Sequence, residues 1–424
     1  MNDEVDQFEL GRQALAQPGP AQRDIVREIR SSFALIQPHE GEAAAWFYQH
    51  FLTANPRYRK YFSNDPGLIQ RRLFQAVERI VADLDRLDAF LPYLRRLALR
   101  HRKFGLRQAH YEAFGVSLLA TVREFTGTRW TDQTEAAWEA GYGLMASVML
   151  AASAEADQTM PPYWEAEVVG HEFVAAGIAQ ITLRLRQDPA RPGRYGFRAG
   201  QYAALETANL VRTWRDFSFS GVPKAVDEVE FQIQAGKPGG VSDTLVNATA
   251  PGDRLRIAAA EGDLAFPSTS KLLAVAHGTG AAPVFALAQA AVEAGDRRPL
   301  RVILVTDGEP HYLARSFEEL AAEHGALAIE EVAGDPLAAV RAHAIAIGEE
   351  SGPEGLAPAG RAGNSRVANN RAASRRSLVA AGEDGAGAAL GAVLVGPSSL
   401  VESCRAALRT AGVAAADISS DLFD

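Results

Sequence analysis

The stretch Leu-Arg-Arg-Leu-Ala-Leu-Arg-His, residues 94–101, decides how the first third of the chain folds. Its apolar residues recur at steps of three and four, which predicts an amphipathic helix with His101 on the apolar face. Comparable patterns follow one another from residue 22 to about residue 155, until Pro161 and Pro162 stop helical structure. The sequence therefore predicts an all-α N-terminal domain in which His101 points inward, either as a buried, hydrogen-bonded structural histidine or as a heme ligand.

Length and composition set the limits for the whole chain. Its 424 residues are 47% hydrophobic and 22% charged, which allows about three globular domains. A net charge of −9 argues against a nucleic-acid partner, and the single cysteine, Cys404, excludes disulfides within the chain and cysteine-based metal clusters. No apolar run is long enough to span a bilayer, and the acidic start MNDEVDQFEL does not read as a secretory signal. We expect a monomeric cytoplasmic protein.

Two further changes of pattern divide the rest of the chain. From about residue 164 the sequence alternates, as in I-T-L-R-L-R at residues 181–186, which predicts an antiparallel β-barrel with one helix starting near Ser242. After Lys271, apolar strands alternate with helices, which predicts a parallel doubly wound α/β sheet. The expected organisation is an N-terminal extension (1–25), a helical domain (26–157), a β-barrel domain (163–267) and a doubly wound domain (270–424) with a mobile, arginine-bearing insertion at about 347–390.

Four stretches of the helical region resemble the flavohemoglobin family, a globin fused to a ferredoxin-reductase-like FAD/NAD(P)H module. They are WFYQHFLTANPRYRKYF (46–62), LRHRKFGLRQAHY (99–111), LLATV (118–122) and AWEAGYGLMASVMLAASAE (137–155). The resemblance covers about residues 26–340 and 391–424. It implies that the helical domain is a heme domain, the barrel an FAD domain and the last domain an NAD(P)H domain.

The resemblance implies that His101 ligates the iron of heme b and that Tyr48 lies over the distal face of the heme. Tyr48 would donate a hydrogen bond to bound dioxygen, a charge-assisted bond worth roughly 1.5–3 kcal/mol. Tyr111 and Glu155 match residues that orient the far ring nitrogen of His101 and make the imidazole more electron-rich. By spacing alone, Tyr48 is equally a core aromatic and Glu155 equally a solvated residue near a helix end.

Other heme contacts follow from the same comparison. Phe62 matches a phenylalanine at the heme edge, and Leu73 matches a leucine that faces the heme. The family has a glutamine four residues before that leucine, where this chain has Ile69, with Gln70 next to it. Either Gln70 serves in its place, or the pocket lacks one polar group.

The barrel region carries a second set of family motifs. Residues 214–220 read W-R-D-F-S-F-S, where related flavin domains have Arg-x-Tyr-Ser. The resemblance assigns Arg215 to the flavin pyrophosphate, Phe217 to stacking on the isoalloxazine and Ser218 to the ring nitrogen that handles the hydride. Phe217 lacks the hydroxyl of the family's tyrosine.

Two short motifs support this assignment. Gly200-Gln201-Tyr202 precedes a strand, and Gly239-Gly240-Val241-Ser242 opens the barrel's helix, where free amides can hold a phosphate. Ser242 is also an ordinary helix N-cap residue, and that role alone would explain its presence.

The last domain begins with a glycine turn between a strand and a helix. Gly278-Thr279-Gly280-Ala281-Ala282-Pro283 is similar to the G-x-G-x-x-P turn of the family's pyridine-nucleotide half, although a lone glycine turn also serves as a plain connection. Gly396-Pro397 matches the family's Cys-Gly-Pro with Val395 in place of cysteine, and Phe423 aligns with the aromatic that covers the flavin, unless it belongs to a frayed tail. Acidic residues at 307 and 309 favour NADH over NADPH.

Together these motifs predict an NAD(P)H-dependent oxidoreductase. As the resemblance implies, it is a nitric oxide dioxygenase that passes electrons from NAD(P)H through FAD to heme, where dioxygen oxidises nitric oxide to nitrate. One alternative is a general heme or flavin reductase. Another is a gas-binding sensor whose reductase half is impaired, which the replacements at Ile69, Phe217 and Val395 motivate.

Overall fold

The structure is a computed structural model that describes residues 19–61, 66–186, 195–223, 227–349 and 389–423. The chain divides into two compact units. One contains Met1–Phe197, Tyr202–Phe217 and Pro223–Glu261, and the other contains Arg198–Gln201, Ser218–Val222 and Gly262–Asp424. Most of the predicted insertion at 347–390 lies outside the described residues. Within the described part of the chain, no helix has the length and hydropathy to cross a bilayer.

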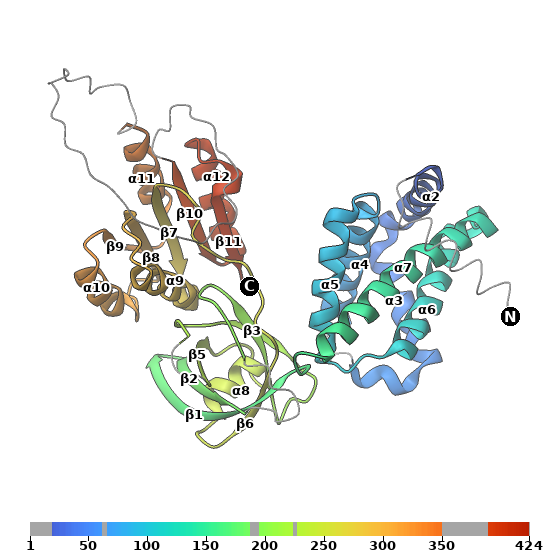
Figure 1. Ribbon diagram of the computed structural model, residues 1–424, viewed down its shortest axis with the longest axis horizontal. Helices are drawn as coiled ribbons and strands as arrows, with labels where there is room; N and C mark the ends of the chain where they lie inside the picture. Colours follow the sequence, from blue (N-terminus) through green and yellow to red (C-terminus); the bar gives the residue numbers. More distant parts are fainter. Residues whose placement is uncertain (1–18, 62–65, 187–194, 224–226, 350–388, 424) are drawn as a thin grey trace, which may run out of the picture. The chain divides into compact units, whose positions relative to one another are not determined.

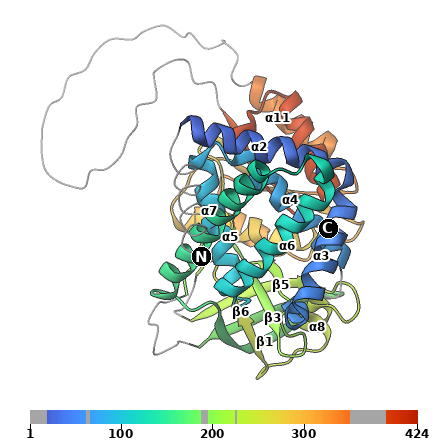
Figure 2. The same ribbon diagram turned by 90° about the vertical axis from the view of Figure 1, so that its right-hand side faces the viewer.

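The N-terminal domain is all-helical, as predicted (Figures 1 and 2). The first helix that the structure describes starts at Pro20, ahead of the expected boundary at residue 26, because proline suits the first turn of a helix. This helix packs against α6 and α7. The α-helices are α2 (Pro20–Ile36), α3 (Glu40–Ala54), α4 (Pro66–Asp83), α5 (Leu87–Arg102), α6 (Gln108–Thr126) and α7 (Asp132–Asp157).

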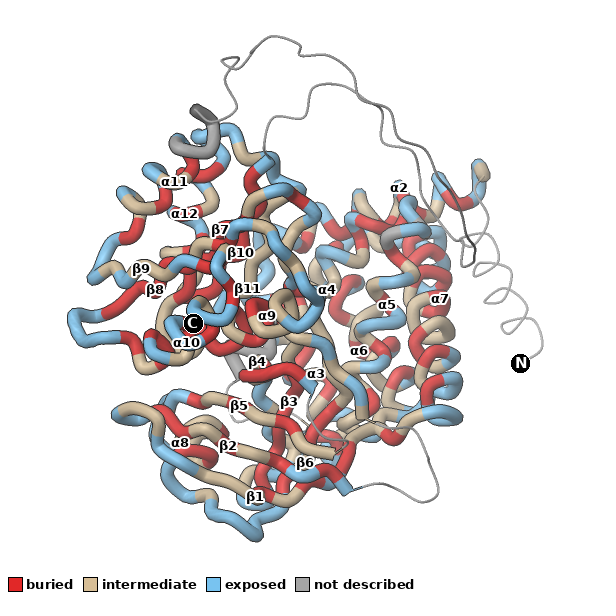
Figure 3. Tube along the Cα trace, turned by 60° about the vertical axis from the view of Figure 1, so that its left-hand side comes forward, coloured by how far each residue is buried: buried red, intermediate tan, exposed pale blue. Residues whose placement is uncertain are grey.

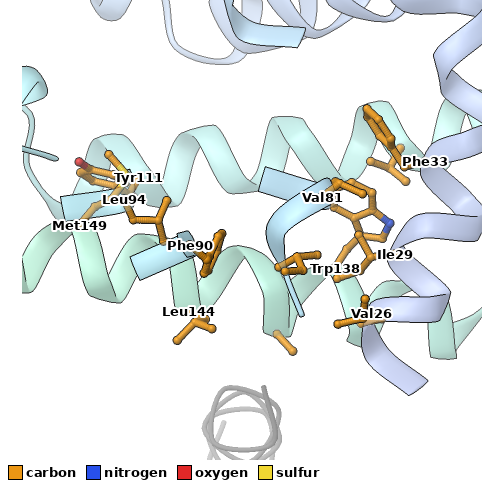
Figure 4. Close-up of a cluster of buried hydrophobic side chains, with 14 of the residues drawn as sticks. Val26, Ile29, Phe33, Val81, Phe90, Leu94, Tyr111, Trp138, Leu144 and Met149 are labelled. Carbon is orange, nitrogen blue, oxygen red and sulfur yellow. The ribbon is translucent and has the colours of Figure 1, made fainter. Parts of the chain in front are cut away.

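Apolar stripes from these helices form a common core, part of which Figure 4 shows. Phe90 and Leu94 of α5 are fully buried, as the three- and four-residue spacing predicts. The indole N–H of Trp138 donates a 2.9 Å hydrogen bond to the Ser32 hydroxyl, so a buried polar atom is satisfied inside the core. The buried face of α5 shows that the helix that carries His101 packs into this core.

The middle domain is a six-stranded antiparallel sheet in the order β4-β3-β6-β1-β2-β5. Ile181 and Leu183 are fully buried while Arg184 is exposed, so the predicted alternation of this strand is confirmed. The predicted helix near Ser242 is α8 (Val241–Asn247). The strands are β1 (Trp164–Ala175), β2 (Ile178–Leu185), β3 (Tyr202–Thr207), β4 (Arg215–Ser218), β5 (Glu228–Gln234) and β6 (Arg254–Ile257).

The last domain is a parallel sheet in the order β11-β10-β7-β8-β9, covered by helices on both faces (Figure 1). Helices α9 and α10 contribute to the core on one face, and α11 and α12 to the core on the other. Figure 3 shows the central strands as buried. The elements are β7 (Lys271–His277), α9 (Ala281–Glu293), β8 (Leu300–Thr306), α10 (Ala314–Glu323), β9 (Leu327–Ala333), α11 (Leu337–Glu349), β10 (Leu390–Gly396), α12 (Ser398–Thr410) and β11 (Ile418–Leu422).

This strand order has a topological switch between β7 and β10, because the chain leaves β7 in one direction along the sheet and returns on the other side of it. In open parallel sheets, ligands bind at the carboxyl ends of the strands at such a switch. Two glycine motifs are predicted to hold the nucleotide. Gly278–Gly280 follows β7 directly, and Gly396-Pro397 begins with the last residue of β10.

Close contact between α6 and α7 depends on Gly115. A Cβ at this position would lie 2.5 Å from the Tyr142 ring. We expect Gly115→Ala to lower the free energy of unfolding by about 1–3 kcal/mol, because the ring must move inside a packed core. Denaturant unfolding measures this loss. Gly41→Ala is the matched control, since a Cβ there meets nothing within 4 Å in helix α3, and it should leave stability unchanged or slightly higher. Equal effects of the two variants would contradict the packing argument.

Candidate functional site

His101 lies in the last turn of α5, and its Nδ1 is 2.7 Å from the Leu97 carbonyl oxygen. A carbonyl oxygen only accepts hydrogen bonds, so Nδ1 carries the proton and Nε2 keeps its lone pair in the neutral ring. Burial lowers the pKa of His101, which favours the neutral form. The side chain can therefore bind a metal such as heme iron through the lone pair of Nε2.

Tyr48 lies in a separate aromatic cluster with Phe47, Phe51 and Tyr58, against which Leu73 packs. Its side chain is 8% exposed, and burial raises the pKa of its hydroxyl, so the hydroxyl remains a hydrogen-bond donor. The structure thus brings together two predicted heme contacts, Tyr48 and Leu73, from α3 and α4. This apolar surface suits the face of a porphyrin.

The predicted arrangement of Tyr111 and Glu155 about His101 is only partly found. Tyr111 is buried in the same core as Leu94 and Ala98, and burial raises its pKa to about 12. Glu155 does not orient the histidine in this structure, because it is exposed and its carboxylate pairs with Arg95. The Leu97 carbonyl takes the place expected for the carboxylate, since a helix offers the carbonyl four residues earlier to Nδ1 without a second element.

Three heme contacts predicted from the sequence remain without side-chain detail. Phe62 lies outside the described residues. Ile69 and Gln70 belong to α4, but the placement of their side chains is not described. The two alternatives, that Gln70 faces the pocket or that the pocket lacks this polar group, therefore stay predictions.

The residues beside His101 connect its helix to the antiparallel sheet. The Arg100 guanidinium contacts the Asp216 carboxylate at 2.8 Å and the Glu261 carboxylate at 3.2 Å. The Lys103 ammonium lies 5.4 Å from the centre of the Trp214 ring. Burial lowers the pKa of Lys103 and raises the pKa of Glu261, which indicates that this cluster is partly shielded from water. The segment with the predicted flavin motif is thus fixed to the helix with the predicted heme ligand.

The predicted flavin residues lie on adjacent strands of this sheet. Arg215 is exposed and Phe217 and Ser218 are half-buried on β4, while Tyr202 begins the neighbouring strand β3. An exposed guanidinium next to a half-buried aromatic ring can hold a pyrophosphate while the ring stacks on a flavin. The donor set fits the group that the motif implies.

A buried carboxylate supports the turn before this motif. Glu206 accepts hydrogen bonds from the Arg212 backbone N–H and, at 3.1 Å, from the Arg256 guanidinium. Arg212 has a φ of +64°, a left-handed backbone conformation that is costly for a residue with a side chain. Its guanidinium lies 4.9 Å from the centre of the Tyr61 ring. The Glu206 carboxylate therefore holds a strained turn directly before the β4 motif.

The predicted phosphate site at α8 is arranged differently from expectation. Gly240 is the N-cap residue, so the alternative role of Ser242 as the N-cap is wrong. Gly239 adopts a φ of +76°, and its N–H donates a 2.8 Å hydrogen bond to the Asp243 carboxylate. That bond lowers the pKa of Asp243. A phosphate would therefore compete with Asp243 for the Gly239 amide, because both are anions.

The nucleotide motif forms a short turn between β7 and α9. Gly278–Gly280 is a 3₁₀ turn, and Pro283 is buried in the first turn of α9. A Cβ on Gly280 would lie 2.9 Å from both the Phe423 ring and the Val395 side chain. The missing side chain thus lets two predicted site residues, Gly280 and Phe423, meet next to Val395 at the end of the sheet.

The C-terminal aromatic is held in place by β11. The Phe423 N–H donates a 3.2 Å hydrogen bond to the Gly396 carbonyl, and β11 pairs in parallel with β10. Gly396 is also close-packed, since a Cβ there would lie 3.0 Å from Leu400. The alternative of a frayed tail is therefore wrong for Phe423, whose ring contacts the glycine turn.

Sequence reasoning missed two groups at these sites. Arg100 reads as one of several basic residues on α5, and nothing local indicates that it reaches Asp216 and Glu261. His311 lies in the loop after β8, and its Nε2 is 3.1 Å from the Gly278 carbonyl oxygen, 33 positions away in sequence. Pattern analysis cannot find such partners because the sheet topology creates their contacts.

Comparison with known proteins finds a matching family model and several relatives. Residues 45–149 match the Globin family. The chain is 28% identical over 298 residues to a flavohemoprotein of Bordetella parapertussis, an alignment that covers 66% of this chain and 73% of the relative. It is 24% identical over 326 residues to a flavohemoprotein of Bacillus subtilis, covering 73% of this chain and 80% of the relative.

The fold has a solved counterpart as well. The crystal structure of a flavohemoglobin from Malassezia yamatoensis, which contains bound FAD and heme, superposes with a TM-score of 0.70. The match covers 95% of this chain and 99% of that chain at 16% identity. The predicted order of a helical domain, an antiparallel sheet and a parallel doubly wound sheet is thereby confirmed.

The role of Glu206 is testable because Arg256 bonds two carboxylates that differ in burial. Glu206 is 4% exposed, whereas Glu165, on the same guanidinium, is 48% exposed. We expect Glu206→Gln to lower the free energy of unfolding by about 1–3 kcal/mol, since it replaces the charge-assisted hydrogen bonds to the Arg212 N–H and the Arg256 guanidinium and turns an amide N–H group toward one of these donors. Glu165→Gln should change it by less than about 1 kcal/mol. Urea unfolding of the full chain measures both, and equal losses would show that Glu206 has no special role.

Proposed function

Because this chain belongs to the flavohemoglobin family, we propose that it is a nitric oxide dioxygenase that uses heme b, FAD and NAD(P)H. The observation that carries the proposal is the state of His101, a neutral imidazole whose Nδ1–H is bonded to Leu97 and whose Nε2 is available to iron. The comparisons support an oxidoreductase of this family, in which a globin is fused to a reductase.

The residues of this chain fit each of the three groups. His101 would ligate the heme iron, with the Tyr48 and Leu73 surface against the ring. Arg215 and Phe217 would hold the FAD, and the turn at Gly278–Gly280 would take the nucleotide. When bound, these groups supply hydride transfer from nucleotide to flavin, single-electron transfer from flavin to heme, and oxidation of nitric oxide by dioxygen at the iron.

The protein orients these groups and places the protons around them. Hydrogen bonding to Leu97 keeps the His101 ring from turning and keeps its proton on Nδ1. The Tyr48 hydroxyl retains its proton because burial raises its pKa, so it can donate a hydrogen bond to dioxygen. The bulky aromatic cluster around Tyr48 limits the access of water to that side.

One contact joins the helix of the proposed heme ligand to the strand of the flavin motif. Arg100, the neighbour of His101, binds Asp216, which lies between Arg215 and Phe217. This contact would fix the flavin-binding strand relative to the heme-binding helix. Distance control of this kind is what electron transfer between two bound groups requires.

NADH is the preferred nucleotide in this proposal. The loop after β8 carries Asp307, whose side chain is 93% exposed, and Glu309. Carboxylates in this loop would accept hydrogen bonds from a ribose 2′-hydroxyl and would repel a 2′-phosphate. The monomeric state and cytoplasmic location stay predictions.

The direct test of the proposed activity is nitric oxide consumption. We expect the purified holoprotein with NADH and dioxygen to remove nitric oxide and to form one nitrate for each nitric oxide consumed. A nitric oxide electrode and a nitrate assay measure both quantities. Rapid NADH oxidation through an added acceptor, without nitric oxide removal, would favour a general reductase. Stable dioxygen binding with no nucleotide-driven reduction would favour the sensor alternative.

The heme assignment is tested by removing the iron ligand. We expect His101→Ala to lose most heme absorbance per chain while keeping bound flavin and NADH-dependent reduction of an artificial acceptor. His50→Gln is the matched control, because His50 is a partly buried histidine of the same domain whose Nδ1 contacts the Ser117 hydroxyl. Absorption spectra and flavin content of both variants give the answer. Full heme content in His101→Ala would contradict the assignment.

A further inference from the structure

His311 is a buried residue that no predicted motif includes. Its side chain is 8% exposed, and it lies between β8 and α10 in the doubly wound domain. Its Nε2 is 3.1 Å from the carbonyl oxygen of Gly278, the first residue of the predicted nucleotide turn. Its Nδ1 is 3.2 Å from the Leu313 backbone nitrogen. One ring thus joins the loop after β8 to the turn after β7.

These two contacts determine the state of the ring. The Leu313 N–H is a donor, so Nδ1 must accept and carries no proton. The Gly278 carbonyl is an acceptor, so Nε2 must carry the proton. His311 is therefore a neutral imidazole with one defined tautomer, and neither contact survives exchange of the two nitrogens' roles.

The Gly278 carbonyl is a sensitive point of the nucleotide turn. It accepts hydrogen bonds from the Ala281 N–H at the start of α9 and from His311. Gly278 has a φ of +54°, a conformation that glycine adopts easily but does not hold by itself. In a trans peptide the C=O of Gly278 and the N–H of Thr279 point in opposite directions. Holding the carbonyl toward His311 therefore directs the Thr279 N–H away from His311, as a phosphate ligand at a helix start requires.

We propose that His311 is a positioning residue that holds the Gly278–Gly280 turn in the form that accepts the dinucleotide, and that protonation of its ring releases this turn. The proposal rests on the NAD(P)H site of the proposed function and assigns that site a built-in acid sensitivity. His311 itself would touch neither the nucleotide nor the flavin. It acts through the Gly278 carbonyl.

The direction of the pH effect follows from the surroundings of the ring. Burial lowers the pKa of His311, although the Gly278 carbonyl and the Glu331 carboxylate oppose this shift. The ring is therefore neutral at neutral pH. A proton added at Nδ1 would face the Leu313 N–H and break that contact. The His311 ring binds this proton more readily when the turn is released than when it is closed. Acidification therefore favours the released turn and weakens nucleotide binding.

Other charged and polar groups surround the ring and enter the design of the test. The Glu331 carboxylate of β9 accepts from the His311 backbone N–H, and the Tyr312 ring stacks on the imidazole at 4.7 Å between centroids. His277, at the end of β7, faces Asp307 at 3.5 Å, and its charge acts to lower the pKa of His311. A variant that removes the proton site at 311 while leaving these groups in place separates their contributions.

Two substitutions of His311 each retain one of its two contacts and remove the other. His311→Gln keeps a side-chain N–H at about the position of Nε2 and does not titrate, so it retains the donor to Gly278. His311→Asn is shorter; its oxygen can accept from the Leu313 N–H two residues on, as asparagine does in turns, but it cannot reach Gly278. The pair isolates the Gly278 contact from the local turn. His343→Gln is the control, because His343 pairs with Glu330 at 2.9 Å and belongs to α11, whose residues pack on the other face of the sheet.

The experiment titrates each full-length holoprotein with NADH by calorimetry at pH 7.5 and pH 5.5, and follows amide hydrogen exchange at residues 278–283 without nucleotide. We expect His311→Asn to bind NADH about fivefold more weakly at pH 7.5, the effect of one hydrogen bond, and to exchange faster in the turn. His311→Gln and His343→Gln should stay within about twofold of the parent at that pH. The parent should lose affinity at pH 5.5, and His311→Gln should lose much less.

The outcomes separate this inference from the proposed function. If the parent binds NADH and His311→Asn binds it equally well, with unchanged exchange in the turn, the positioning role is wrong and the proposed function stands. Equal acid sensitivity of the parent and His311→Gln overturns the protonation step. If the parent binds neither NADH nor NADPH, the proposed nucleotide site fails and the role of His311 fails with it.

Discussion

The hydrogen bond from His101 to the Leu97 carbonyl is the interaction on which the functional account depends. It is made within one helix turn, so its geometry follows from the helix and not from a distant partner. Because it fixes the proton on Nδ1, it leaves the lone pair of Nε2 free for the metal ion that the proposed function places there. Burial works in the same direction, since it disfavours the charged ring that could not bind iron.

The position of His101 at the end of α5 links this constraint to the rest of the chain. Its neighbour Arg100 leaves the helix towards the antiparallel sheet and bonds Asp216 and Glu261. Glu206 in turn holds the strained turn that precedes the strand of Asp216. The helix that would hold the heme and the strand that would hold the flavin are therefore connected by charges placed at the ends of both elements.

A second constraint governs the doubly wound domain. Its strand order places the ends of β7 and β10 side by side, and both ends carry glycines where other residues would clash. Because Gly280 has no side chain, Phe423 and Val395 can pack directly against it. Val395, which stands where the family has a cysteine, is one of the side chains packed against this turn.

Much of this architecture can be predicted from the sequence because it depends on local pattern. The spacing around Leu94 predicts a buried helix face, the alternation at residues 181–186 predicts a half-buried strand, and the G-x-G-x-x-P motif predicts a turn between a strand and a helix. The pairing of Glu155 with Arg95 on the facing helix could not be predicted, since no sequence pattern shows which residues two packed helices bring together. His311 cannot be found from pattern, because only the sheet brings it to Gly278.

The central claim is that one chain carries electrons from nucleotide through flavin to heme. The most direct measurement is the visible spectrum of the purified holoprotein under anaerobic conditions, before and after NADH is added. The account predicts that the heme band shifts from the ferric to the ferrous position while the flavin absorbance bleaches. A heme band that stays ferric in the presence of bound flavin and NADH would contradict it.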